Sequence, residues 1–379
     1  MATAPTLAFP IAEYERRCAI VRKEMRARGV DVLIVDECEA LEYLTGTANT
    51  LNLYRACVFP ADAPPTMLLR KLDEAPLREA SWVEDIRPFA DWEDQVECVA
   101  RAVRDRGYGK ATVGMDFGSY AMTVRRFRQY EGFLPDARIV DIGPVLNEAR
   151  LIKSPEEIAL LRQASAIGDE AMRIAIEAVR EGATERDAAV AASGAFVRLG
   201  ADNGACGPIT SGVGAGFLHG HLHDRPLVRH DVVHMELTPR VHGYSARLMR
   251  PAVVGAATPR QQHVADTLIA LQDAQIAAMK PGAEARAVDA ILREGILKSG
   301  LRETFDNLTG YTLGLYHRAT PRTSDFTRVV GPQVDYRMEA GMTFHMWVAA
   351  DGLAFSETVL VAPGGGERLT RIERKLFVR

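Results

Sequence analysis

The sequence has few features that would connect it with an oxidising compartment or a membrane. Its five cysteines are odd in number and lack C-x-x-C spacing, which argues against a disulfide scaffold and against a zinc ribbon. It contains no apolar run of about 18 residues, so no membrane-spanning helix is expected. Residues 1–10 lack a basic segment followed by an apolar run, so we expect no signal peptide. These absences predict a cytoplasmic protein.

Clustered charge of one sign is also missing. The formal net charge is −4, and no block of five or more like charges occurs. Because binding to a phosphate backbone requires a concentrated positive field, we expect no nucleic-acid partner. The 379 residues are 47% hydrophobic and 25% charged, which is an ordinary mixture for a globular chain of two or three domains.

The first part of the chain alternates helical and strand patterns. Residues 11–28 have a helical pattern, and Val30 to Val35 form a nearly continuous apolar run, as a strand buried on both faces requires. Shorter apolar stretches follow at residues 56–59 and 111–114. This alternation predicts a small α/β domain over residues 1–146.

A strong helix start marks the second domain, which we place at residues 147–379. Ser154 is suited to the N-cap, Pro155 to the first helical position and Glu157 to a capping box. From Cys206 onward strand and turn patterns dominate. Two further helical stretches are expected, at residues 261–279 and 287–298. The second domain is therefore predicted to be of the α+β class.

Four stretches carry a family pattern in sequence order. They are residues 146–158, the Ser211-Gly212 pair followed by His219 and Asp224-Arg225-Pro226, the Gly243-Tyr244 pair followed by Arg250, and Gly341 to Phe344 with Glu357 to Val361. Together they resemble the prolidase/creatinase family of pita-bread aminopeptidases, and the resemblance covers essentially the whole chain. It implies a creatinase-type amino-terminal domain of the ribonuclease H-like α/β class and an α+β pita-bread catalytic domain.

The family's metal ligands have no full counterpart here. In its metal-dependent members two Asp, one His and two Glu hold two divalent ions, which turn a shared water into hydroxide. The corresponding positions in this sequence are Glu236, Arg247, Tyr311, Trp347 and Ser356. Arg247 puts a permanent positive charge where a carboxylate belongs, and Trp347 offers no lone pair. The resemblance therefore implies that the metal site is lost, and we expect no metal and no cofactor.

The family also has metal-free members, creatinase and ectoine hydrolase. Residues 310–314, 341–345 and 356–358 look closer to ectoine hydrolase. Residues 316–321 depart from its pattern, and Met249 replaces a carboxylate of creatinase. The resemblance implies a metal-independent hydrolase that cleaves a C–N bond, of an amidine, guanidine or amide, in a small zwitterionic or cationic metabolite.

Three residues are the catalytic candidates. His219 stands where the family has an active-site histidine, and an imidazole carries protons well at neutral pH. Glu236 lies in an otherwise apolar strand, where a carboxylate is unfavourable unless it is paired or functional. It could accept a proton, bind a cation or act as a nucleophile. Glu357, in a similar strand, could hold His219 or the substrate, or form a structural ion pair with an arginine.

His219 also begins an H-x-H-x-H pattern with His221 and His223. On a strand all three side chains would project to one face. Such a cluster could bind zinc, or it could lie at the rim of the site.

Further residues are candidates for substrate binding. Arg247 and Arg250 lie three apart on one predicted strand, so at most one of them is expected to enter the pocket and hold a carboxylate. Tyr311 could donate a hydrogen bond to an oxyanion, or it could pack. His345 is either a site residue or a buried core histidine, and Trp347 is expected to line the pocket.

In the metal-free relatives the amino-terminal domain of a neighbouring subunit closes the pocket. Tyr54 and Arg55 stand at the place where that contribution is expected. The resemblance thus implies a homodimer in which Tyr54 or Arg55 reaches the neighbouring site.

Two other functions stay open. The same fold serves as a protein-binding domain in some chaperone and proliferation-associated proteins, so a catalytically inactive binding module is one alternative. An Xaa-Pro peptidase is the other, but it requires metal ligands that this sequence lacks. Polar residues at the pocket positions favour the hydrolase, because a decayed pocket should fill with apolar side chains.

Overall fold

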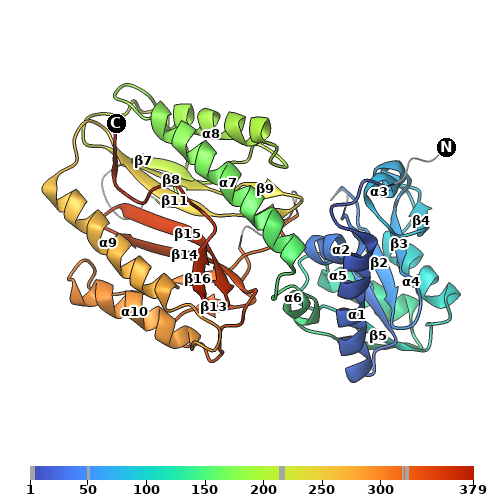
Figure 1. Ribbon diagram of the computed structural model, residues 1–379. Coiled ribbons are helices and arrows are strands. Elements are labelled where there is room, and N and C mark those ends of the chain that lie inside the picture. The colour runs from blue at the N-terminus through green and yellow to red at the C-terminus, as the bar shows by residue number, and fades with distance from the viewer. Residues whose placement is uncertain (1–4, 49–51, 213–217, 318–319, 321–323) are drawn as a thin grey trace. The chain divides into compact units, whose positions relative to one another are not determined.

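The structure is a computed structural model that describes residues 5–48, 52–212, 218–317, 320 and 324–379. Part of the loop before His219 and part of the divergent stretch 316–321 therefore lie outside the described residues. Within those residues, every helix is too short or too polar to cross a bilayer. The chain forms two compact units that divide between Arg150 and Leu151 (Figure 1).

The amino-terminal unit is built on a six-stranded mixed sheet with the strand order β4-β3-β2-β1-β5-β6. Its elements are α1 (Ile11–Ala27), β1 (Val32–Val35), α2 (Cys38–Thr45), β2 (Ala56–Pro60), β3 (Thr66–Arg70), η1 (Lys71–Asp73), α3 (Glu74–Ala80), β4 (Asp85–Phe89), α4 (Gln95–Asp105), β5 (Thr112–Met115), α5 (Val124–Phe133), β6 (Arg138–Asp141) and α6 (Val145–Ala149). Strand β1 is antiparallel to β2 and parallel to β5, and all of its residues are buried. The predicted α/β class of this unit is confirmed.

In the residues that the structure describes, the carboxy-terminal unit consists of a mainly antiparallel sheet with one parallel strand pair, a separate two-stranded sheet and four long helices. Its elements are α7 (Pro155–Ala178), α8 (Glu185–Leu199), β7 (Ile209–Gly212), β8 (Val232–Leu237), β9 (Arg240–Val241), β10 (Tyr244–Ser245), β11 (Leu248–Val253), α9 (Pro259–Ala277), α10 (Ala285–Lys298), β12 (Gly310–Thr312), β13 (Val329–Val330), β14 (Thr343–Ala350), β15 (Leu353–Ala362), β16 (Gly365–Arg368) and β17 (Phe377–Val378). The order along the main sheet is β13-β12-β14-β15-β11-β8-β7. The predicted α+β class is confirmed.

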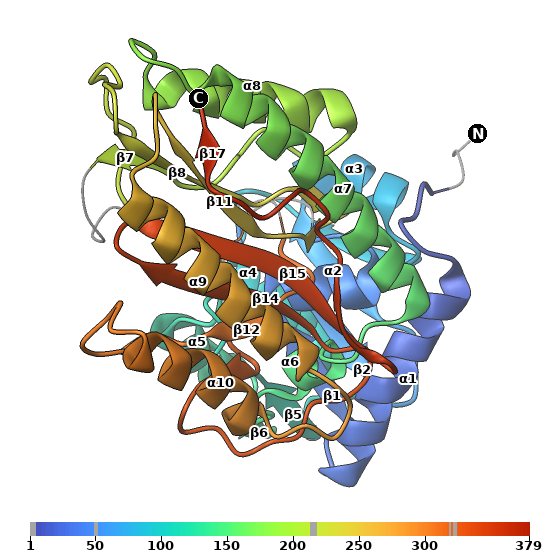
Figure 2. The same ribbon diagram turned by 60° about the vertical axis from the view of Figure 1, so that its left-hand side comes forward.

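The helices of this unit cover one face of its sheet (Figure 2). Helix α7 begins as the sequence predicted, because the Ser154 hydroxyl accepts a hydrogen bond from the Glu157 amide and the Glu157 carboxylate accepts one from the Ser154 amide. Helices α7 and α8 pack on β7, β8 and β11, whereas α9 packs on β14 and β15.

Alternation along the strands decides which side chains point away from the helices. On β8, Met235 belongs to the core under α7 and α8, so its neighbour Glu236 points to the other face. On β15, Phe355 belongs to the core under α9 and α10, so Ser356 also points to the other face. Polar side chains of several strands thus gather on the face opposite these helices, which no helix of the described residues in this unit covers.

Candidate active site

Two adjoining cavities, of about 410 and 420 Å³, lie against the uncovered face of the sheet. They share four lining residues, which are His219, Asn307, Tyr311 and Trp347. Glu236 and His345 line the first cavity, and Arg247 lines the second. Cavities of this size suit a small molecule.

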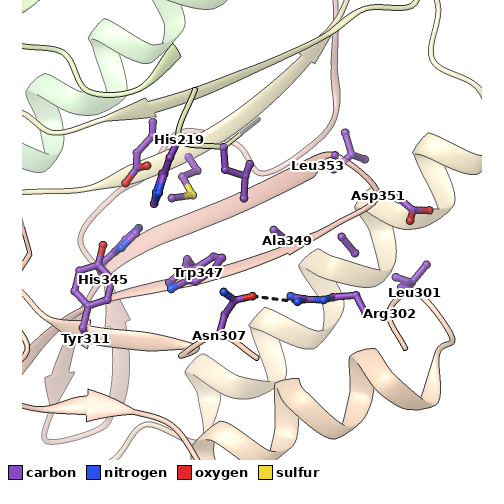
Figure 3. Close-up of a pocket in the computed structure, with 15 residues that line it drawn as sticks. His219, Leu301, Arg302, Asn307, Tyr311, His345, Trp347, Ala349, Asp351 and Leu353 are labelled. Carbon is purple, nitrogen blue, oxygen red and sulfur yellow. Dashed lines mark hydrogen bonds between the residues drawn. The ribbon is translucent and has the colours of Figure 1, made fainter. Parts of the chain in front are cut away.

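Strand register brings residues that are distant in sequence into one row. Successive partners across β8, β11, β15 and β14 are Glu236, Met249, Ser356 and Trp347. In the next row Tyr311 on β12 is the partner of His345 on β14. Glu236, Ser356, Trp347 and Tyr311, four of the five positions predicted to correspond to the family's metal ligands, therefore share one face of the sheet. Figure 3 shows His219 opposite His345 in the cavity that they line.

Glu236 and Arg247 form a buried ion pair in the wall of the cavities. Arg247 Nε lies 2.5 Å from Glu236 Oε1, and the two side chains are 8% and 1% exposed. Burial lowers the pKa of Arg247, but the Glu236 carboxylate raises it above its ordinary value, so the guanidinium stays charged. Glu236 Oε2 is buried and has no hydrogen-bond partner among the described residues. A carboxylate with one uncommitted oxygen can accept a proton or bind a cation.

Arg247 also forms a hydrogen bond with Tyr311. Arg247 Nη1 donates to the Tyr311 oxygen at 2.6 Å and to Ser324 Oγ at 3.0 Å. Burial raises the pKa of Tyr311 although Arg247 acts in the opposite direction, so the phenol keeps its proton at neutral pH. The phenol oxygen accepts from a cation and is also hydrogen-bonded with Ser324, so its proton can be donated to Ser324 or to an oxygen that develops negative charge.

Two histidines on this face are fully buried. Neither ring nitrogen of His234 or of His345 has a hydrogen-bond partner among the described residues. Burial, together with the nearby His219, lowers the pKa of His234 to about 3. Burial, together with Arg247, lowers the pKa of His345 well below its ordinary value. Both rings are therefore neutral at physiological pH, and the His345 residue lies in the lining of the first cavity.

We expect the free energy of unfolding to fall as the pH drops below about 6.5, the ordinary pKa of histidine. In that range His234 and His345 take up protons in the unfolded chain but not in the folded one, because their folded-state pKa values are depressed. Each ring adds a slope of about 1.4 kcal/mol per pH unit down to its folded-state pKa. Urea denaturation over a pH series measures this slope.

A pair of variants isolates this effect. The His345→Phe variant should lose one histidine's share of the slope, whereas replacing the exposed His263 by Phe should leave it unchanged. Burial raises the pKa of Asp36 to about 6, so proton uptake by Asp36 increases the free energy of unfolding as the pH falls. This contribution is the same in the wild type and in both variants. An identical slope in the wild type and His345→Phe would contradict the expectation.

The H-x-H-x-H segment does not form a strand, so the expectation that its three side chains share one face was wrong. Alternation requires an extended strand, and the described residues from 218 to 228 form none. His219 lines both cavities, while His221 is exposed and His223 Nδ1 lies 3.2 Å from Glu185 Oε2. In the part of the chain that the structure describes, no group of three or more His, Cys, Asp or Glu side chains could hold a metal ion.

Glu357 is not brought to His219 or to the cavities. It follows Ser356 directly, so it points to the face that the helices cover. There Arg250 Nη2 donates to Glu357 Oε1 at 2.8 Å, and Thr370 donates to Glu357 Oε2. Arg250 also donates to backbone carbonyls, including that of Ser356 at 3.0 Å. The structure therefore shows the structural ion pair, which was one of the two roles predicted for Glu357. The prediction that Glu357 is a catalytic residue is corrected, because its side chain lies away from the cavities.

Tyr54 and Arg55 both lie in the interior of the amino-terminal unit. The Tyr54 hydroxyl donates to Asp36 Oδ2 at 3.1 Å, and the Arg55 guanidinium donates to Cys38 Sγ. Side chains that are 3% and 5% exposed and engaged in this way are not displayed for a neighbouring subunit. The homodimer itself stays a prediction, but these two residues do not support it.

Sequence reasoning missed the lining residues Asn307 and Ser324, and it missed His234, which lies on the same face of the sheet without lining a cavity. His234 could have been found, because it precedes Glu236 by two positions on one strand and must share its face. Asn307 and Ser324 lie outside the regular strands, and no local signal marks them. Their place depends on how the segments around β12 fold back over the sheet.

Two family models match the chain. The model described as Creatinase/Prolidase N-terminal domain matches residues 17–152, and the model described as Metallopeptidase family M24 matches residues 159–378. The two matches together cover both structural units.

Individual relatives resemble the chain over most of its length. An uncharacterised hydrolase/peptidase of Sinorhizobium fredii is 30% identical over 394 residues, which is 98% of this chain and 97% of the relative. The ectoine hydrolase of Halomonas elongata is 26% identical over 409 residues, which is 99% of each chain. An Xaa-Pro dipeptidase of Pyrococcus furiosus is 30% identical over 261 residues, which is 68% of this chain and 73% of the relative.

Solved structures share the fold. The prolidase from Pyrococcus horikoshii OT3 superimposes with a TM-score of 0.83 at 20% identity, over 96% of this chain and 100% of that one. The N-terminal domain of the FACT complex subunit SPT16 from Cicer arietinum superimposes with a TM-score of 0.73 at 15% identity, over 96% and 97% of the chains. At these identities the likeness shows the fold alone.

Proposed function

Because the chain belongs to metallopeptidase family M24 and carries a creatinase/prolidase N-terminal domain, we propose that it is a hydrolase that cleaves a C–N bond of a small polar compound without the family's pair of metal ions. The observation that carries the proposal is the Glu236–Arg247–Tyr311 arrangement, with its uncommitted carboxylate oxygen in the cavity wall.

The donor set does not fit a pair of divalent ions. Such a pair needs several anionic oxygens or imidazoles at once. Glu236 is the one carboxylate among the five corresponding residues, and its charge is already balanced by Arg247 at 2.5 Å. The Trp347 indole has no lone pair to offer. No step of the proposed reaction uses a metal.

The reaction begins with Glu236 as a general base. Its Oε2 takes a proton from a water molecule, and the water oxygen bonds to the substrate carbon. Arg247 and the Tyr311 phenol stabilise the negative charge that develops on the substrate. The proton that Glu236 has taken passes through solvent to His219, and His219 donates it to the leaving nitrogen as the C–N bond breaks. Direct attack by Oε2 on the carbon is the covalent alternative.

The second cavity can hold a charged end of the substrate. Arg240, Ser245 and Ser324 line it together with Arg247. Guanidinium and hydroxyl groups are suited to a carboxylate. Similarity over the full length to the ectoine hydrolase of Halomonas elongata supports a small substrate of this kind.

We expect hydrolysis by the whole chain to be unaffected by exhaustive chelation. Ectoine, N-hexanoylglycine and Ala-Pro are the probes, each incubated with protein that has been dialysed against EDTA. Mass spectrometry detects the released amine or ring-opened product. Because the cavity side chains supply the base, the acid and the charge stabilisation, a non-peptide probe should be cleaved at the same rate with and without EDTA.

Two results would contradict this expectation. Cleavage of Ala-Pro that EDTA abolishes and Mn²⁺ restores would favour the activity named for the Pyrococcus furiosus relative. Stabilisation of the protein by a probe in thermal melting, without cleavage of any probe, would favour an inactive binding module.

A further inference from the structure

The first cavity has an apolar arm that the proposed reaction does not use. We define the apolar arm by Leu218, Met249, Leu301, Ala349 and Leu353, of which Leu301 and Leu353 also belong to the core under α9 and α10. Figure 3 shows the arm leading from His219 and His345 toward the turn between β14 and β15. Met249 lies beside Glu236 at the reacting end of the cavity, and Leu301, Ala349 and Leu353 lie toward the other end.

The polar groups near the far end of the arm already have partners. Arg302 Nη2 donates to Asn307 Oδ1 at 3.0 Å, the bond drawn in Figure 3. The Asp351 carboxylate is paired with Arg260 at 2.5 Å. Most of the surface that remains for a ligand in this cavity is apolar, which water wets poorly and an apolar group fills favourably.

Small residues at the β14–β15 turn keep the arm open. Ala349 follows Trp347 by two positions on β14, so its methyl group points to the same face. Ala350 and Gly352 also line the cavity and add little volume. A longer side chain at Ala349 would project into the arm and shorten it.

We propose that the substrate of this site is an amide that carries a short unbranched apolar chain on one branch and a carboxylate on the other. The apolar arm holds the chain, and the arginine-lined second cavity holds the carboxylate. The two cavities meet at His219 and Tyr311, which places the C–N bond beside the reacting groups. This inference rests on the proposed hydrolytic function, whose substrate class it names.

A series of N-acylglycines tests the apolar arm. N-acetyl-, N-butanoyl- and N-hexanoylglycine differ solely in chain length. Burial of each additional CH₂ strengthens binding by about fourfold. Affinity measured by calorimetry, and kcat/KM where cleavage occurs, should therefore rise by about fifteenfold from acetyl to butanoyl and level off when the arm is full.

A matched pair of variants locates the effect. Ala349→Leu should weaken the binding of N-hexanoylglycine by about tenfold or more, because the new side chain occupies the arm. The binding of N-acetylglycine should be nearly unchanged. Ala270→Leu makes the same change at an exposed position of α9 and should leave the whole series unchanged. Melting temperatures establish that both variants are folded.

The outcomes separate this inference from the proposed function. Equal affinity for the three probes, or no binding of any, would overturn the apolar arm as a substrate site. Ala349→Leu that retains the wild-type preference for N-hexanoylglycine would overturn it as well. Binding that strengthens with chain length but leads to no cleavage would support the arm and count against hydrolysis. Cleavage at a rate that is independent of chain length would support hydrolysis and count against the arm as a substrate site.

Discussion

Replacing Glu236 by glutamine is expected to lower kcat/KM by about 100- to 10,000-fold, the range that a positioned general base contributes. Glutamine has nearly the same shape and can still accept a hydrogen bond from Arg247, but it cannot take a proton from water. The loss should fall on kcat rather than on KM if Glu236 acts as a base. If the carboxylate binds a substrate cation instead, KM should rise.

The matched control is Glu170→Gln, which removes a carboxylate that is 42% exposed on α7 and paired with Arg173. This variant should keep the wild-type rate, since its surface ion pair lies outside the cavities. Circular dichroism and melting temperature check that Glu236→Gln is folded. Full activity in a folded Glu236→Gln protein would refute the proposed reaction.

Glu357→Gln is expected to lower the free energy of unfolding by about 3–5 kcal/mol. Glu357 and Arg250 are both fully buried, and Arg374 Nε also lies 3.4 Å from Glu357 Oε1. Removing the carboxylate charge leaves a buried guanidinium uncompensated, which is far less favourable than losing an exposed pair. Urea denaturation measures the difference.

A double variant and an activity assay complete this test. Adding Arg250→Met to Glu357→Gln should recover part of the lost stability, because the uncompensated charge is removed as well. The folded fraction of Glu357→Gln should retain its kcat/KM, since this side chain faces the helices. A stable Glu357→Gln protein without activity would instead support the catalytic role that the sequence suggested.

Local sequence signals predicted the elements that depend on neighbouring residues. The capping box at Ser154 and Glu157 and the apolar run of β1 were read correctly because each needs a few adjacent side chains. The H-x-H-x-H pattern failed because spacing alone does not make a strand. A strand also needs a partner to which it can hydrogen-bond, and the described part of this segment has none within the sheet.

The site could be predicted in part from alternation along the strands. Glu236, Tyr311 and Trp347 line the first cavity, where the resemblance implied that they belong, and His345, for which the sequence left a core position open, lines it as well. The opposite direction of Glu357 was implicit in the sequence, because Ser356 precedes it on one strand and a step of one residue reverses the face. The burial of Tyr54 was not implicit in the sequence, because its partners Asp36 and Tyr130 come from other parts of the chain.

The sequence by itself determined which residues stand at the positions that the resemblance pairs with the family's metal ligands, and residue identity is sufficient to show that a guanidinium and an indole are not metal ligands. The tertiary structure alone decided that Arg247 binds both Glu236 and Tyr311, and that Glu357 is committed to Arg250. It also decided that an apolar arm extends from the reacting groups. These contacts join strands far apart in the chain, so they follow from the register of the sheet and from the packing of helices on one of its faces.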